Sequence, residues 1–311
     1  MPEAYIIDAV RTPRGIGKPG KGALSHLHPQ HLAATVLAAL KARNKLDTST
    51  VDDIIWSTST QEGKQGGDLG RMSALAAGYD INASGTTLDR FCGGGITSVN
   101  LAAASVMSGM EDCVIAGGTE MMSYQQTLAA ERSKAGQPAR MMGSGNPALD
   151  EIHPQSHQGV CGDAIATREG ISREACDALA LTSQQRAKRA IDEGRFAKSV
   201  IPVLNEDGSI ALGREEFPRP ETTAEGLASL KPSFEQLADF DLGNGTTFKK
   251  QIQRRYRADA DFRRTVDRYV GEFERLLGDQ GLQIVSRLMG LFVCALAAQI
   301  IFTGVKNYLV P

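Results

Sequence analysis

Residues 86–96 read Thr86-Thr87-Leu88-Asp89-Arg90-Phe91-Cys92-Gly93-Gly94-Gly95-Ile96, and this stretch decides the fold. The residues before Cys92 predict a strand, the three glycines predict a tight turn, and small residues from Ile96 to about Met107 predict a helix. The free N–H groups and positive dipole end of such a helix would stabilise a thiolate on Cys92. The pattern therefore indicates a cysteine nucleophile. A small buried cysteine in a packing site of glycine and alanine explains the stretch equally well.

Apolar strands alternate with Ala-rich helices on both sides of this stretch. The pattern predicts strands at 4–10, 53–58, 84–90 and 112–117, and helices at 29–43, 69–77 and 95–108. This alternation is typical of an α/β layered sheet. Residues from about 120 to 248 differ, because their loops are rich in Gly, Pro and Ser. Within them we expect a helix at 172–193, capped by Ser172, and a hairpin at 200–212.

Composition limits the class of protein. Five cysteines at irregular spacing in 311 residues form no disulfide framework, and the opening residues contain no signal peptide, so we expect a cytoplasmic chain. A net charge of −2 argues against nucleic-acid binding. His26, His28 and His31 lie close together in the sequence, but no cysteine or carboxylate nearby completes a shell, so we predict no metal.

Six segments, in order and at characteristic spacing, resemble the thiolase family. They are residues 4–13, Arg90-Phe91-Cys92, Gly117-Gly118-Thr119-Glu120, residues 157–164, residues 171–174 with 183–187, and residues 230–234. The resemblance covers roughly residues 1–250. It implies a thiolase-like layered α/β/α half at 1–119, followed by a loop domain at 120–250 that covers coenzyme A.

The resemblance implies acyl transfer between coenzyme A thioesters. Cys92 would accept the acyl group as a thioester, and its own N–H would be one oxyanion donor. His157 aligns with a family histidine near the acyl pocket, where lining the pocket is favoured over proton transfer. Arg219 falls where the family places an arginine that contacts coenzyme A; a solvated arginine is nearly as compatible. Acyl-CoA and CoA would be the partners, no cofactor is needed, and a folded chain would form a homo-oligomer.

The family's second half has no counterpart in this sequence. Thiolases continue into Asn-Glu-Ala-Phe and Gly-His-Pro motifs and a second reactive cysteine, which supply the bases of the reaction. Here all five histidines precede residue 158, and the one late cysteine, Cys294, lies in an apolar run. We therefore expect a truncated, weakly active or inactive acyltransferase whose sheet lacks its last strand.

Two other segments follow the thiolase-like part. Residues 251–280 predict an amphipathic, Arg-rich helix, and residues 281–311 a hydrophobic helix whose apolar run, 288–305, reaches the lower length limit for a membrane span. This tail resembles the last helix of MarC-type integral membrane proteins. A buried or oligomer-forming helix is the alternative. The chain thus resembles a fusion, and a membrane-tethered, non-catalytic acyl-CoA-binding protein is the competing hypothesis.

Overall fold

The computed structural model describes residues 3–137, 146–152 and 157–234. These residues belong to two compact units. The first holds residues 3–137 and 189–218, and the second holds the described residues between 146 and 188 together with 219–234. The predicted helices at 251–280 and 281–311 lie outside the described residues.

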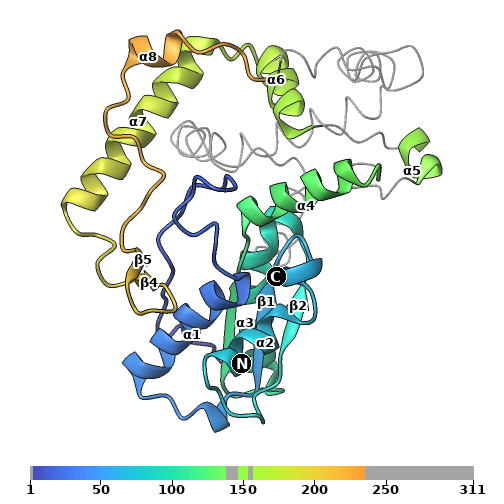
Figure 1. The fold of residues 1–311 in the computed structure, drawn as a ribbon, viewed down its shortest axis with the longest axis vertical. Coiled ribbons are helices and arrows are strands. Elements are labelled where there is room, and N and C mark those ends of the chain that lie inside the picture. Colours follow the sequence, from blue (N-terminus) through green and yellow to red (C-terminus); the bar gives the residue numbers. More distant parts are fainter. Residues whose placement is uncertain (1–2, 138–145, 153–156, 235–311) are drawn as a thin grey trace, which may run out of the picture. The chain divides into compact units, whose positions relative to one another are not determined.

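A parallel sheet forms the centre of the first unit (Figure 1). Its strands are β1 (Asp53–Ser57), β2 (Thr86–Leu88) and β3 (Val114–Gly118), in the order β2-β1-β3. Ile55 of β1 pairs with Thr86 on one side and with Ala116 on the other. Three of the four predicted strands are thereby confirmed. Because the strands are parallel, their carboxyl ends share one edge, where α/β sheets carry their sites.

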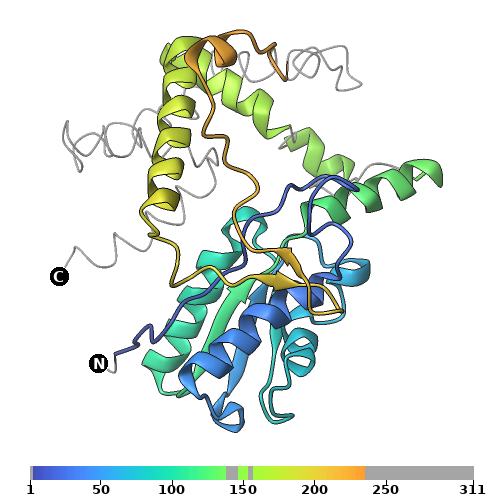
Figure 2. The same ribbon diagram turned by 60° about the vertical axis from the view of Figure 1, so that its left-hand side comes forward.

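Helices cover both faces of this sheet (Figures 1 and 2). On one face, α1 (Pro29–Asn44) and α2 (Leu69–Ala76) form a core with β1, in which Leu37, Ile54 and Leu69 are fully buried. On the other face, α3 (Gly94–Ser108) packs against β1 and β3. Successive residues of β1 point to opposite faces, so that Ile54 and Trp56 join the first core while Ser57 meets the start of α3. The layered α/β class is confirmed.

A hairpin completes the first unit. It consists of β4 (Val203–Leu204) and β5 (Ile210–Leu212), as predicted for 200–212, and its Val203 and Leu212 pack against Leu24 and Leu27 before α1. The carboxylate of Glu216, just after the hairpin, accepts hydrogen bonds from the amides of Ile16 (2.8 Å) and Ala23 (3.2 Å). These contacts hold the loop before α1 against the hairpin.

Helices dominate the second unit. It contains α5 (Pro147–Ile152), α6 (Gln158–Glu169), most of α7 (Arg173–Asp192) and α8 (Ala224–Ala228). Ser172 caps α7 as predicted, because its Oγ accepts from the amide of Ala175 at 3.2 Å. The Arg173 guanidinium donates to the carbonyl of Leu227 at 2.6 Å, which joins α7 to α8.

The sequence prediction missed several helices between residues 120 and 234. Besides α5, α6 and α8, these include α4 (Met122–Lys134), which follows β3 in the first unit. α4 is polar, so it lacks the apolar stripe by which a helix is recognised in a sequence. It consists largely of good helix formers such as Gln125, Leu128 and Glu131, which explains why it forms.

The predicted strand at 4–10 is wrong. These residues form no strand, and Tyr5, Ile6 and Ile7 are 73%, 81% and 83% exposed. The nearest pairing is a single bridge from Arg11 to Val200. A strand exists only where a neighbour satisfies its backbone hydrogen bonds. Within the described part of the chain, no strand lies beside 4–10.

Candidate active site

The chain leaves the sheet directly after Leu88. The amide of Thr58, beyond β1, donates to the carbonyl of Leu88 at 3.1 Å, so the backbone of Leu88 is still hydrogen-bonded to the segment that follows β1. Three residues after Leu88 the path turns: Phe91 has φ +46°, in the left-handed region that costs a side-chain-bearing residue about 1–2 kcal/mol. The amide of Phe91 donates to Oδ1 of Asp89 at 2.8 Å. This hydrogen bond closes a turn of the kind that aspartate side chains form with the backbone two residues on.

Cys92 lies in the 3₁₀ turn Phe91–Gly93, which leads directly into α3. The helix begins at Gly94, one residue before the predicted range 95–108. Cys92 is exposed. It therefore stands just before the first helical turn, where peptide dipoles favour a negative charge.

The three glycines after Cys92 are not equivalent. Gly93 and Gly94 have ordinary helical φ values of −88° and −57°, so the sharp turn that the sequence assigned to the glycines is made by Phe91. A Cβ at Gly94 would lie 2.7 Å from both Cβ and Oγ of Ser57, whereas a Cβ at Gly95 would meet nothing within 4 Å. Only Gly94 is required by close packing, because it lets α3 approach the end of β1.

Glu120 connects the loops at the same edge of the sheet. Its carboxylate accepts hydrogen bonds from the amide of Ser59 (2.6 Å) and from the side chain of Gln65 (3.1 Å). Gln65 is fully buried, and its Oε1 accepts from the amide of Met121 at 2.8 Å. Glu120 thus ties the loop after β1 to the loop after β3. The sequence showed Glu120 as part of a motif but gave no sign of this role.

His157 lies in the second unit, apart from the unit that contains Cys92. It is the N-cap of α6, where its Nδ1 accepts from the amide of Gly159 at 3.1 Å, and its ring lies 5.0 Å from that of Phe234. A ring whose Nδ1 accepts an amide proton carries its own proton on Nε2. The cap therefore occupies one of the two ring nitrogens of His157.

Arg219 also belongs to the second unit and is exposed. Its backbone amide donates to Oε1 of Gln184 at 2.7 Å, and its carbonyl accepts from the hydroxyl of Thr222 at 2.7 Å. The backbone is therefore anchored to α7, while the guanidinium is open to solvent.

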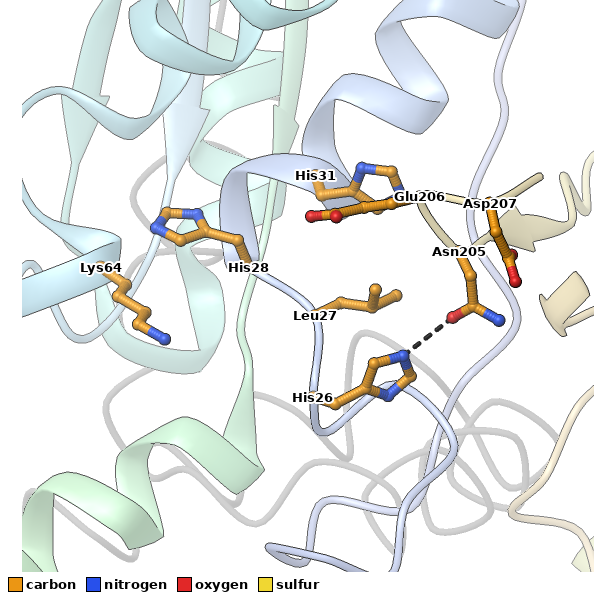
Figure 3. A pocket seen from close by; sticks show the side chains of 8 residues that line it. All are labelled: His26, Leu27, His28, His31, Lys64, Asn205, Glu206 and Asp207. Carbon is orange, nitrogen blue, oxygen red and sulfur yellow. Dashed lines mark hydrogen bonds between the residues drawn. The ribbon is translucent and has the colours of Figure 1, made fainter. Parts of the chain in front are cut away.

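A pocket of about 510 Å³ in the first unit contains the three early histidines (Figure 3). His26 Nε2 lies 2.8 Å from Oδ1 of Asn205, and His31 Nε2 lies 2.8 Å from the carbonyl oxygen of Leu204. His28 caps α1, and its burial, followed by the charge of Lys64, lowers its pKa. In the described residues, no group of three His, Cys, Asp or Glu side chains is arranged to hold a metal ion. His31 thus joins α1 to the hairpin, and His26 joins the loop before α1 to the turn of the hairpin.

The chain belongs to the thiolase family, since residues 4–244 match the family model of the thiolase N-terminal domain. It is 33% identical over 257 residues to a beta-ketoadipyl-CoA thiolase of Acinetobacter baylyi, covering 79% of this chain and 63% of that protein. It is 36% identical over 259 residues to a 3-ketoacyl-CoA thiolase of Shewanella denitrificans, covering 79% and 60%. The chain therefore spans about three fifths of the length of these curated relatives.

A solved structure of similar fold is the acetyl-CoA acetyltransferase of Bacillus anthracis, with a TM-score of 0.61 and 28% identity over 75% of this chain and 59% of that one. Residues 263–309 match a second family model, that of the MarC family of integral membrane proteins. Across residues 3–137, 146–152 and 157–234, no helix combines the length and the apolar character that crossing a membrane requires. The apolar run at 288–305 lies outside those residues.

Proposed function

We propose that this chain is a thiolase-type acyltransferase in which Cys92 is the acyl-accepting nucleophile. The observation that carries the proposal is the exposed Cys92 at the carboxyl edge of a parallel sheet, directly before α3, within the residues that match the thiolase family. The thiolate would attack the carbonyl carbon of an acyl-CoA. A bond forms between Sγ and that carbon, the bond from the carbon to the CoA sulfur breaks, and CoA leaves as a thiol after taking up a proton.

The acyl group would then pass to the α carbon of a second acyl-CoA in a Claisen condensation. In the opposite direction, CoA would cleave a 3-ketoacyl-CoA. The relatives' names support this class of substrate, because they include 3-ketoacyl-CoA and beta-ketoadipyl-CoA thiolases. Acyl-CoA and CoA are the partners in this proposal, with His157 lining the acyl site and Arg219 contacting CoA. We also propose that the chain forms a homo-oligomer. Light scattering would test this by measuring the molar mass in solution.

Acylation of the protein by acetyl-CoA tests the nucleophile. After a short incubation of the full chain, peptide mass spectrometry should find an acetyl group on Cys92. Cys176, which is also exposed, is an internal control and should stay unmodified. A Cys92→Ala variant should take up no acetyl group. Equal acetylation of Cys92 and Cys176, or none on Cys92, would contradict the proposal.

Turnover by this chain alone should be slow. Thiolysis also needs groups that move protons, each worth roughly 10²- to 10⁴-fold, and the chain has no histidine beyond His157. Steady cleavage of acetoacetyl-CoA, followed by its absorbance, should therefore fall far below that of a complete thiolase assayed in parallel. A rate within about tenfold of that enzyme would show that turnover does not need the bases of the family's second half.

The match of residues 263–309 to the MarC model favours a second candidate function, a membrane-tethered acyl-CoA-binding protein without turnover. Acylation of Cys92 by acetyl-CoA, measured beside calorimetric titration with CoA, distinguishes it from the enzyme. A binding protein would bind CoA at a Cys92→Ala variant as tightly as at the wild type, and wild-type Cys92 would not be acylated. The acyltransferase proposal requires acylation.

A further inference from the structure

We propose that Asp89 is a positioning residue for the nucleophile: by accepting the amide proton of Phe91, it holds the left-handed turn that presents Cys92 at the start of α3. The inference rests on the proposed function of Cys92. It adds a residue that does not touch the substrate and acts through the backbone.

The first argument is the path of the chain. Leu88 is the last residue held by the neighbouring strand, and Gly94 is fixed by its packing on Ser57. Between these two fixed points the chain reverses through Phe91, whose φ of +46° is unfavourable for a residue with a side chain. Such a conformation persists only where the surroundings enforce it.

The second argument is that few contacts can enforce it. The side chain of Phe91 is 56% exposed, so packing holds it weakly. Among the described residues, one side chain makes a hydrogen bond to the backbone of residues 89–93. It is Asp89, whose Oδ1 accepts from the Phe91 amide at 2.8 Å. One backbone hydrogen bond, from the Gly93 amide to the Arg90 carbonyl at 3.0 Å, closes the turn across Phe91 and Cys92 and acts together with the Asp89 contact.

The third argument is chemical. The direction of the Cys92 side chain follows from the backbone of Phe91, and an error of about 1 Å at a reacting atom can cost about 10²-fold in rate. Relaxation of Phe91 to an ordinary conformation would also move the sulfur away from the helix end that favours its thiolate. Asp89 would prevent both changes.

Two variants separate the hydrogen bond from the charge. Asp89→Asn keeps an oxygen at the same distance from the backbone but loses the charge. Asp89→Glu keeps the charge, but its longer side chain cannot close the same turn. We expect Cys92 in Asp89→Asn to react with iodoacetamide within about threefold of the wild-type rate, and in Asp89→Glu about tenfold more slowly. Peptide mass spectrometry after timed pulses gives both rates, with Cys176 as reference.

Asp207→Glu is the matched control. Asp207 makes the same contact on the hairpin, where its Oδ1 accepts from the amide of Ser209 at 2.9 Å. This variant should leave the Cys92 rate unchanged. Labelling of half-buried Cys113, which should stay slow in every variant, verifies that the fold is intact.

A charge effect predicts the reverse order, with Asp89→Glu like the wild type and Asp89→Asn altered, and that result would overturn the inference. Equal rates in both variants would also overturn it. Alkylation by iodoacetamide needs no acyl-CoA. If Cys92 is not acetylated, the proposed function is contradicted, but the alkylation rates of the Asp89 variants still test whether Asp89 positions Cys92.

Discussion

At the residue scale, the described cysteines differ in exposure and in the charge near them. Cys92 and Cys176 are exposed, whereas Cys113 and Cys161 are half-buried. Burial, together with the nearby charge of Asp52, raises the pKa of the Cys113 thiol. A raised pKa leaves less thiolate at neutral pH, so Cys113 should be a poor nucleophile.

Iodoacetamide should therefore label Cys92 first near neutral pH. Cys92 is exposed directly before α3, so the reagent reaches it, whereas the raised pKa of the Cys113 thiol slows its reaction. Mass spectrometry after a short pulse measures the order. Equal labelling of Cys92, Cys113, Cys161 and Cys176 would contradict the prediction that Cys92 is activated.

Gly94 and Gly95 give a second residue-scale prediction. Gly94→Ala places a methyl group 2.7 Å from Ser57 and should lower the free energy of unfolding by about 1–3 kcal/mol. Gly95→Ala is the matched control, because its methyl group meets open space and alanine favours a helix by roughly 0.5–1 kcal/mol. Urea unfolding compares the two variants. Equal stabilities would show that α3 can move away from β1.

At the scale of elements, a buried tyrosine connects the segment after α2 to α1. Tyr79, three residues after α2, donates its hydroxyl to the carbonyl of Leu37 in α1 at 2.9 Å. Burial raises the pKa of Tyr79 to about 12, and the charge of ionised Cys113 adds to the shift. The folded state therefore holds this phenol neutral at pH values where an unfolded chain would ionise it.

This shift predicts how stability depends on pH. Because the pKa is raised in the folded state, the contribution is complete below pH 10 and is lost as the pH rises towards about 12. The free energy of unfolding, measured in urea at a series of alkaline pH values, should fall more steeply in the wild type than in Tyr79→Phe. At neutral pH the variant should be less stable by about 1 kcal/mol, since it loses the bond to Leu37. Parallel curves for the two proteins would refute the assignment.

At the scale of the whole molecule, two family models match consecutive parts of one chain. The thiolase match ends at residue 244, and the MarC match runs from 263 to 309. No helix among the described residues has the length and apolar character needed to cross a membrane. The apolar run at 288–305 is the segment whose length could allow it.

The full chain should therefore sediment with membranes and resist carbonate washing, whereas a chain ending before Gly278 should remain in the supernatant. The physical reason is the cost of exposing the apolar run to water, roughly 25 cal/mol per Å². Ultracentrifugation of both forms, expressed side by side, is the measurement. A full-length chain that stays in the supernatant as a single species would mean that the run packs in a core or between subunits.

The sequence by itself determined the class of fold and singled out Cys92 as the candidate nucleophile. Strands at 53–58, 84–90 and 112–117 and the helices between them could be predicted because apolar periodicity is local information. Cys92 could be singled out for the same reason, since a strand, a run of glycines and a helix are adjacent in the chain. Ser172 was recognisable as a cap because capping involves neighbouring residues.

Tertiary structure alone decided the rest. The strand at 4–10 was predicted from its apolar residues, but it needs a neighbour that no local pattern can supply. The chain turns sharply at Phe91 rather than at the glycines. A glycine is needed at position 94 because Ser57, far away in the sequence, lies against it. Glu120 joins two loops for a similar reason. Periodicity reports which face of an element is apolar, whereas a close approach between distant residues is set only when the elements pack.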